Sequence, residues 1–145
     1  MSEKLELFID GEFIQSETEN WIQVLNPATQ EVLCEAPCAT ESEIENAISS
    51  AQAAFLTWRE TPPPERSRIM MRYQELLKQN QDKIAEILSK ENGKTFEDAK
   101  GDVWRGIEVV EQAANITPLL MGETVENVAR EIDSYSYLQS LGVCL

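Results

Sequence analysis

Short apolar runs separated by turn residues dominate the first 37 residues of the chain. Leu5–Ile9 and Glu12–Ile14 flank Asp10-Gly11, a pair that suits the two positive φ angles of a type I′ turn. Two further strand-like runs follow on either side of an Asn-Pro turn: Trp21–Leu25 and Glu31–Ala36. The pattern therefore predicts a β-hairpin followed by two strands, arranged together as a small meander.

Between residues 40 and 121 the period changes, and apolar residues recur at three- and four-residue steps, which is typical of amphipathic helices. Thr40 and Glu43 form a capping box that predicts the start of the first helix. The predicted buried stripe of this helix consists of Ile44, Ala47, Ile48, Ala51, Phe55 and Trp58. The prolines of Thr61-Pro62-Pro63-Pro64 end it and start the next helix.

The second predicted helix ends at Asn92-Gly93, where glycine suits a left-handed cap. Its predicted buried stripe consists of Ile69, Tyr73, Leu76, Leu77, Ile84, Ile87 and Leu88. Thr95 and Asp98 cap a third helix, which we expect to end at Pro118 and Gly122. The stripe of the third helix is rich in small residues, so another helix can approach it closely: Ala99, Val103, Gly106, Ile107, Val110, Ala113, Ala114 and Thr117.

Beyond Gly122 the pattern becomes that of a strand, with Tyr135, Tyr137, Leu141, Val143 and Leu145 on alternate positions of the run from Ile132 to Leu145. The predicted fold class is therefore α/β. Residues 1–37 are expected to form strands, residues 40–121 three helices and residues 122–145 strands. An apolar run up to the last position is unusual for a domain and raises the question of where this strand leads.

The charge of the chain excludes several classes of partner. Twelve basic and 26 acidic residues give a net charge of −14, without any histidine. This composition lacks the basic patch that nucleic-acid binding needs, and it does not favour an anionic membrane. The opening Met1-Ser2-Glu3-Lys4 has no apolar signal-peptide region, and no apolar run reaches the roughly 18 residues of a membrane helix. We therefore expect one modest domain in the cytoplasm.

Catalytic and metal-binding motifs are missing from the sequence. The three cysteines are interpreted as reduced structural thiols, because Cys34 and Cys38 form a single CxxxC pair and Cys144 has no histidine to activate it. The sequence contains neither a GxGxxG nor a GxxxxGK[ST] phosphate loop, and no GxSxG elbow. We expect no catalytic residue, no cofactor site and no metal site within these residues.

One charged residue of the third helix has two interpretations. In GDVWRGIEVVE, residues 101–111, Arg105 lies off the apolar stripe, in line with Gly101, Glu108 and Gln112. It could pair with Asp102 and Glu108, which lie three residues away on either side. Alternatively, its guanidinium could bind the carboxylate of a ligand in a bidentate way. Spacing alone favours the surface pair.

Several segments, taken in order, resemble the amino-terminal part of the NAD(P)-dependent aldehyde dehydrogenase superfamily. They are LFIDGEFI, VLNPATQEVL, AQAAFLTWRETPPPERSRIMMRYQELL and ENGKTFEDA, so the resemblance covers nearly the whole chain. GDVWRGIEVVEQAANITPLLMGET and DSYSYLQSLGVC further resemble the CoA-acylating methylmalonate-semialdehyde dehydrogenases. The chain departs from the family pattern at Ser140, where proline is typical, and at Leu145, where a small residue is typical.

The resemblance implies a role for Arg105 in binding the carboxylate of methylmalonate or malonate semialdehyde. It also implies a parent enzyme in which a cysteine thiolate forms a thioester, NAD accepts a hydride and CoA takes the acyl group, giving propionyl-CoA or acetyl-CoA. The resemblance further implies that the last strand leads into a nucleotide-binding core, which these residues lack, as they lack that cysteine, the general-base glutamate and the cofactor loop. The 145-residue chain alone is therefore expected to be an inactive fragment that binds no cofactor. The parent enzyme could serve either valine breakdown or inositol breakdown.

Two other hypotheses remain open at this point. The chain could be a non-catalytic module that associates with itself through Ile132 to Leu145, because an unpaired strand edge favours pairing with another copy. It could also be a segment of another semialdehyde dehydrogenase, whose opening would look alike. The resemblance itself implies a homo-oligomer that uses the carboxy-terminal strand, with a small aldehyde as its substrate.

Overall fold

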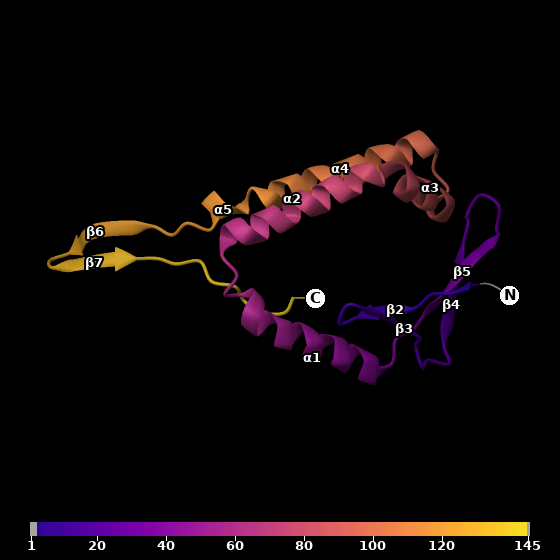
Figure 1. Ribbon diagram of the computed structural model, residues 1–145, viewed down its shortest axis with the longest axis horizontal. Coiled ribbons are helices and arrows are strands. Elements are labelled where there is room, and N and C mark those ends of the chain that lie inside the picture. The colour runs from indigo at the N-terminus through magenta and orange to yellow at the C-terminus, as the bar shows by residue number, and fades with distance from the viewer. Residues whose placement is uncertain (1–2, 145) are drawn as a thin grey trace.

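The computed structural model describes residues 3–144, in which strands lie at both ends of the fold and helices between them (Figure 1). The strands are β1 (Glu3–Lys4), β2 (Leu7–Ile9), β3 (Glu12–Ile14), β4 (Trp21–Leu25), β5 (Val32–Pro37), β6 (Thr124–Ala129) and β7 (Ile132–Tyr135). The helices are α1 (Glu41–Trp58), α2 (Pro63–Gln79), α3 (Gln81–Asn92), α4 (Phe96–Ala114) and α5 (Ile116–Leu119). The α/β class predicted from the sequence is therefore confirmed. Parts of two predictions concern Met1-Ser2 and Leu145, which lie outside the described residues.

The predicted hairpin is confirmed as the antiparallel pair β2–β3. Its turn residues Asp10 and Gly11 have φ angles of 55° and 80°, as a type I′ turn requires. Phe8 and Phe13 face each other across the strands, with their ring centroids 4.8 Å apart.

The predicted meander is wrong, although β4 and β5 form at the expected places. β2 and β3 pair with each other in a sheet of their own, and a separate three-stranded sheet has the order β1-β5-β4. Its third strand, β1, pairs in parallel with β5, with Glu3 opposite Cys34. Alternation along a strand shows which residues extend but not which edge they meet, so the sequence pattern could not reveal this pairing.

The capping box at the start of α1 is confirmed, and its Glu43 also binds residues of a distant loop. The Thr40 hydroxyl accepts the amide of Glu43, and the Glu43 carboxylate accepts the amide of Thr40 at 2.7 Å. The same carboxylate accepts the Glu17 amide at 2.8 Å and the Ser16 hydroxyl at 3.1 Å. Hydrogen bonds from the backbone of Thr40 and then of Glu17 lower the pKa of Glu43. This buried carboxylate thus ties the loop after β3 to the first turn of α1.

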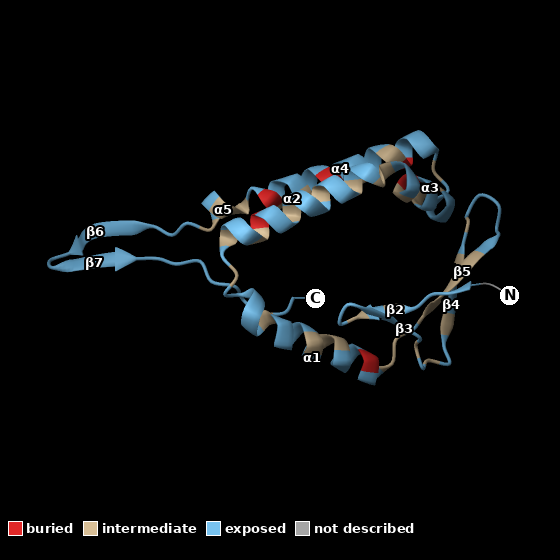
Figure 2. Ribbon diagram, in the orientation of Figure 1, coloured by how far each residue is buried: buried red, intermediate tan, exposed pale blue. Residues whose placement is uncertain are grey.

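The apolar stripe predicted for α1 does not form a core with the other helices of the described chain. Ile44 is 48% exposed and Trp58 is 47% exposed. α1 lies apart from the α2–α4 helices and contacts β2 (Figure 1; Figure 2). The periodicity correctly predicted an amphipathic helix, but the expectation that this face is buried is wrong for residues 3–144.

The second predicted helix is two helices, α2 and α3, and the prediction of a single one is wrong. Asn80 leaves the helical region, with φ −107° and ψ 10°. Its side-chain amide donates to the Leu76 carbonyl at 2.8 Å, which competes with the regular backbone bonds. Both halves pack against α4, so the apolar periodicity continues across the break. The predicted end of α3 is confirmed, because Gly93 adopts φ 77°.

The core lies between α4 and the pair α2–α3 (Figure 2). It is built from Ala85, Ala99, Ile107 and Ala114, all buried. The Ser67 hydroxyl on α2 donates to the Ala114 carbonyl on α4, which joins the two helices. The predicted close approach over small residues is confirmed by Ala99 and Ala114. Five residues that were expected in the core are exposed, and the prediction is wrong for them: Ile69, Tyr73, Leu76, Ile87 and Gly106.

Helix α4 ends earlier than predicted. Asn115 interrupts it, and Pro118 is the third residue of the short α5 instead of a stop signal. Proline is tolerated there because the first turn of a helix has no intrahelical partner for its missing N–H group.

The last predicted strand is shorter than expected. β7 pairs with β6 only as far as Tyr135, and residues 136–144 form no strand. All residues of β6 and β7 are exposed, and the hairpin extends away from the helices (Figure 1; Figure 2). A side chain at Gly122 would collide with the Ser136 carbonyl, so glycine permits the two segments to meet at the base of the hairpin.

Candidate functional site

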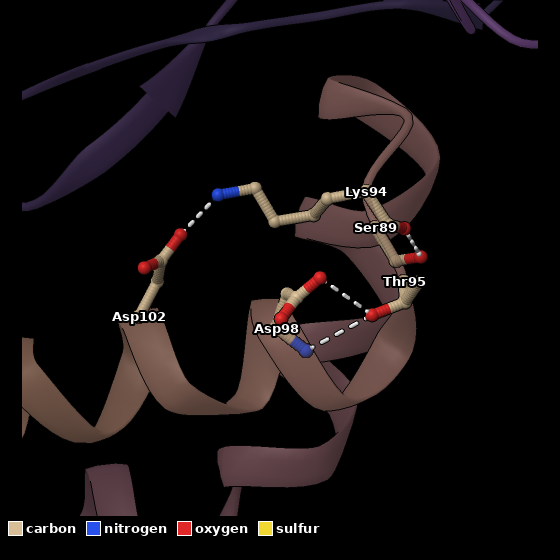
Figure 3. Close-up of polar contacts among 5 residues, drawn as sticks. All are labelled: Ser89, Lys94, Thr95, Asp98 and Asp102. Atoms are coloured by element: carbon tan, nitrogen blue, oxygen red, sulfur yellow. Dashed lines mark hydrogen bonds and ion pairs between the residues drawn. The ribbon is translucent and has the colours of Figure 1, made fainter.

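The candidate site begins where α3 turns into α4. Gly93 reverses the chain, and Thr95 caps α4 by accepting the amide of Asp98 at 3.2 Å (Figure 3). The Thr95 hydroxyl also donates to the Asp98 carboxylate at 2.8 Å. The predicted cap is therefore confirmed, and it determines where the first turns of α4 lie.

Lys94 is held inside this turn by groups on both sides. The Ser89 hydroxyl donates to the Lys94 carbonyl at 2.7 Å. The Lys94 ammonium group forms an ion pair with Asp102, two turns into α4 (Figure 3). This hydrogen-bonded ion pair, followed by the more distant charge of Arg105, lowers the pKa of Asp102.

Arg105 lies one turn further along α4 and is exposed. It borders a surface depression of about 470 Å³, which is lined by Lys94, Glu97, Asp98, Gly101, Asp102 and Arg105. Gly101 lies four residues before Arg105, and a Cβ atom added there would meet no heavy atom within 4 Å. Because this neighbour has no side chain, a ligand can approach the guanidinium along the helix.

The surface pair that spacing favoured for Arg105 does not form in the part of the chain that the structure describes. Asp102 binds Lys94 instead, and Glu108 accepts the indole N–H of Trp104 at 3.2 Å. The ion pairs of residues 3–144 are Arg59–Glu60, Lys94–Asp102 and Lys100–Asp82, and Arg105 belongs to none of them. Both carboxylates that could neutralise Arg105 therefore have other partners.

The chemistry available at this depression is anion binding. A free guanidinium presents a planar fork of N–H donors that matches a carboxylate. The surrounding carboxylates limit the negative charge of the anion, because three of them and two cations line the depression. A ligand with one carboxylate fits this balance better than a polyphosphate does.

The cysteines lie away from this depression. Cys34 is partly buried on β5, and Cys38 and Cys144 are exposed; all three are free thiols. Within residues 3–144 no three His, Cys, Asp or Glu side chains gather in a way that could hold a metal ion. In the same range no helix has the length and apolarity needed to cross a membrane.

Lys94 is the site residue that the sequence patterns missed. Its partner Asp102 is eight residues away, across a turn and a helix start, so no helical spacing relates the two. The Asn92-Gly93 cap was the available indication, because it predicts a sharp reversal that brings the next side chain back over α4.

Comparison with known proteins finds relatives of this chain both by sequence and by structure. The sequence profile described as the aldehyde dehydrogenase family matches residues 13–145. A Dictyostelium discoideum protein is 53% identical over 138 residues, which cover 95% of this chain and 26% of that protein. Its name assigns it to the acylating methylmalonate-semialdehyde/malonate-semialdehyde dehydrogenases of mitochondria.

Two solved structures share the fold. One, from Sinorhizobium meliloti, is described as a methylmalonate-semialdehyde dehydrogenase in complex with NAD; it is 39% identical, with a TM-score of 0.92 over 98% of this chain and 29% of that one. The other is the methylmalonate-semialdehyde dehydrogenase of Oceanimonas doudoroffii, which is 43% identical with a TM-score of 0.88. The match covers 96% of this chain and 28% of that one. The chain thus spans between a quarter and a third of the length of these relatives.

Proposed function

The chain belongs to the aldehyde dehydrogenase family, and from this membership we propose that it forms the amino-terminal part of an acylating methylmalonate-semialdehyde dehydrogenase. The complete enzyme would oxidise methylmalonate or malonate semialdehyde with NAD and CoA, giving propionyl-CoA or acetyl-CoA. The observation that carries this proposal is the agreement between relatives found by sequence and by structure, which bear the same enzyme name.

Within that enzyme, we assign Arg105 to the binding of the substrate carboxylate. The support is local: its guanidinium is exposed, has no carboxylate partner in the described chain and borders an open depression. Both semialdehydes carry a carboxylate that a guanidinium can bind through two parallel hydrogen bonds. Because Arg105 would hold one end of the substrate, it would position the aldehyde without taking part in bond making.

We assign neither NAD nor CoA contacts to the described residues. The sequence has no glycine-rich phosphate loop, and the three carboxylates of the α4 depression would repel a pyrophosphate. The cofactor chemistry of the enzyme therefore belongs to other segments. The contribution of residues 3–144 to the reaction is the binding and orientation of the substrate.

The activity assay that tests this function compares the chain with a joined enzyme. In the joined enzyme, residues 1–145 replace the matching segment of the Oceanimonas doudoroffii dehydrogenase. We expect no NADH from malonate semialdehyde, NAD and CoA with the 145-residue chain, because it lacks the catalytic cysteine segment. The joined enzyme should form NADH with CoA dependence, as followed by absorbance at the nicotinamide band.

Two outcomes would contradict the proposal. Formation of NADH by the 145-residue chain would show a catalytic site that the sequence patterns did not reveal. A folded joined enzyme that oxidises propionaldehyde but ignores malonate semialdehyde would point to another semialdehyde dehydrogenase. The Oceanimonas doudoroffii enzyme itself serves as the positive control.

We further propose that the β6–β7 hairpin joins copies of the enzyme into a homo-oligomer. The supporting observation is its exposure: Val125, Val128, Ile132 and Tyr135 all lie open to solvent on a two-stranded ribbon. Such a ribbon is marginally stable alone and presents unpaired edges. The pairing segment would be β6 and β7, which is shorter than the run from Ile132 to Leu145 expected from the sequence.

Light scattering after size exclusion tests this association. We expect the chain to have at least the mass of a dimer at high concentration, and Ile132→Lys to shift it to a monomer, because a charge on the ribbon opposes strand pairing. Val109→Lys, which changes an exposed apolar residue of α4, should leave the mass unchanged. A monomeric mass for the unaltered chain at every concentration would refute the association.

The predicted cytoplasmic location remains a prediction. The Dictyostelium discoideum relative is named as a mitochondrial protein, which concerns where that protein resides. Fractionation of cells that carry the complete enzyme, with an antibody against residues 3–144, would assign the compartment directly.

A further inference from the structure

Three features restrict the position of the Lys94 side chain. Gly93 reverses the chain in the left-handed region immediately before it, and the Ser89 hydroxyl holds its carbonyl. Its ammonium group then spans the turn to Asp102 (Figure 3). The Lys94 side chain is 28% exposed, and it is less exposed than Lys100, whose 38% exposed side chain forms the comparable pair with Asp82.

Asp102 is a carboxylate of the depression that lies within helical reach of Arg105. The two residues are three positions apart on α4, a spacing at which an acid and a base can meet on a helix. The charge of Arg105 already acts on Asp102, because it is among the causes that lower the pKa of that carboxyl. Without Lys94, Arg105 would be the cation that this spacing makes available to Asp102.

We propose that Lys94 is a positioning residue, which holds the Asp102 carboxylate away from Arg105 and so keeps the guanidinium available to the substrate carboxylate. This inference rests on the substrate-binding role proposed above for Arg105. Lys94 does not contact the substrate in this account. It acts through Asp102, as the ion pair between them in Figure 3 indicates.

The electrostatic balance of the depression supports the same role. Two cations and three carboxylates line it, and removal of Lys94 would leave Arg105 alone among the three carboxylates. A released Asp102 would then compete with the substrate for the guanidinium and repel its carboxylate as well. Neutralising Asp102 in the same variant would remove both effects and restore the net charge.

The first test uses the 145-residue chain itself and measures the exchange of the Arg105 Nε–H proton with water by nitrogen-15 NMR. We expect fast exchange in the unaltered chain, because Arg105 has no partner in the described residues. In Lys94→Ala the exchange should slow severalfold as Asp102 binds the guanidinium, and in Lys94→Ala/Asp102→Asn it should return to the original rate. Unchanged exchange in the single variant would refute the proposal.

The second test measures steady-state kinetics in the joined enzyme. For malonate semialdehyde, Lys94→Ala should raise KM about five- to tenfold with little change in kcat, because a like charge then faces the bound carboxylate. For propionaldehyde both constants should stay the same. The double variant Lys94→Ala/Asp102→Asn should restore KM to within about twofold of the starting value.

A matched control and a rescue separate this role from a purely structural one. Lys100→Ala removes a cation and an ion pair from α4, the helix that carries Asp102, but it frees Asp82, which does not line the depression. It should leave the KM for malonate semialdehyde unchanged. If the Lys94–Asp102 pair only stabilised the turn, the double variant would be at least as impaired as Lys94→Ala, and that result would overturn the inference.

The two proposals fail in different ways. If Arg105→Ala leaves the preference for malonate semialdehyde intact, the substrate role of Arg105 is wrong, whatever Lys94 does to the NMR exchange. If Arg105→Ala removes that preference but Lys94→Ala has no effect on it, the substrate role stands and the positioning role of Lys94 is wrong.

Discussion

Replacing Arg105 by alanine in the joined enzyme should reduce kcat/KM for malonate semialdehyde by about 10- to 150-fold, as expected for the loss of roughly 1.5–3 kcal/mol of charged hydrogen bonding. The guanidinium has no competing partner in the described chain, so its donors are available to the substrate. Propionaldehyde has no carboxylate, so its kcat/KM should remain within about twofold of the original value. Steady-state rates of NADH formation with both aldehydes provide the measurement.

Two further variants sharpen the test of Arg105. Arg105→Lys keeps the charge but not the planar fork, so it should recover part of the loss and not all of it. Arg72→Ala removes an exposed arginine from α2, away from the depression, and serves as the matched control with both aldehydes unaffected. An equal loss for malonate semialdehyde and propionaldehyde in Arg105→Ala would remove Arg105 from the substrate site.

Replacing Ile107 by alanine should destabilise the 145-residue chain by about 2–4 kcal/mol, the range found when a buried aliphatic side chain is truncated. Ile107 is 1% exposed and is the largest fully buried side chain in the described chain. Its removal leaves a cavity between α4 and the helices that pack on it. Urea unfolding, followed by the helical circular dichroism signal, measures the change in the free energy of unfolding.

Val109 provides the control for Ile107. It lies on the same helix and is also β-branched, but it is 69% exposed. Val109→Ala should change stability by less than about 0.5 kcal/mol, since no cavity forms and alanine favours the helix. Equal effects of the two substitutions would mean that the α2–α4 contact is not the core of the chain in solution.

The beginnings of α1 and α4 and the end of α3 could be read from short stretches of sequence. The caps at Thr40 and Thr95 and the left-handed Gly93 are all found where the residue types predicted them. Each depends on hydrogen bonds or backbone angles within a few residues. The same holds for the Asp10-Gly11 turn, whose positive φ angles follow from its own two residues.

The break at Asn80 is a helix boundary that the sequence pattern did not predict. The apolar period runs through it without a change, because α2 and α3 both pack on α4. Asparagine is a weak helix former but also occurs inside helices, so its presence alone does not predict a break, and its side-chain bond to the Leu76 carbonyl is seen only in the structure.

The arrangement around Arg105 was accessible only in part from the sequence. Periodicity placed Arg105 off the apolar stripe, and its exposure confirms that placement. The partners of Asp102 and Glu108 could not be read from spacing, because Asp102 could bind Arg105 within its helix or a cation outside it, and Glu108 could bind Arg105 or Trp104. The choice between them followed from the α3–α4 turn, which brings Lys94 over Asp102.

Local sequence thus accounts for the type I′ hairpin and the helix caps, since neighbouring residues alone supply their hydrogen bonds and backbone angles. Tertiary structure decided which of those elements meet: β1 with β5, Ser67 with Ala114, and Lys94 with Asp102. The physical reason is that periodicity reports which face of an element is apolar but not which surface covers it. Within residues 3–144, Arg105 has no ion-pair partner because such a distant contact engages Asp102.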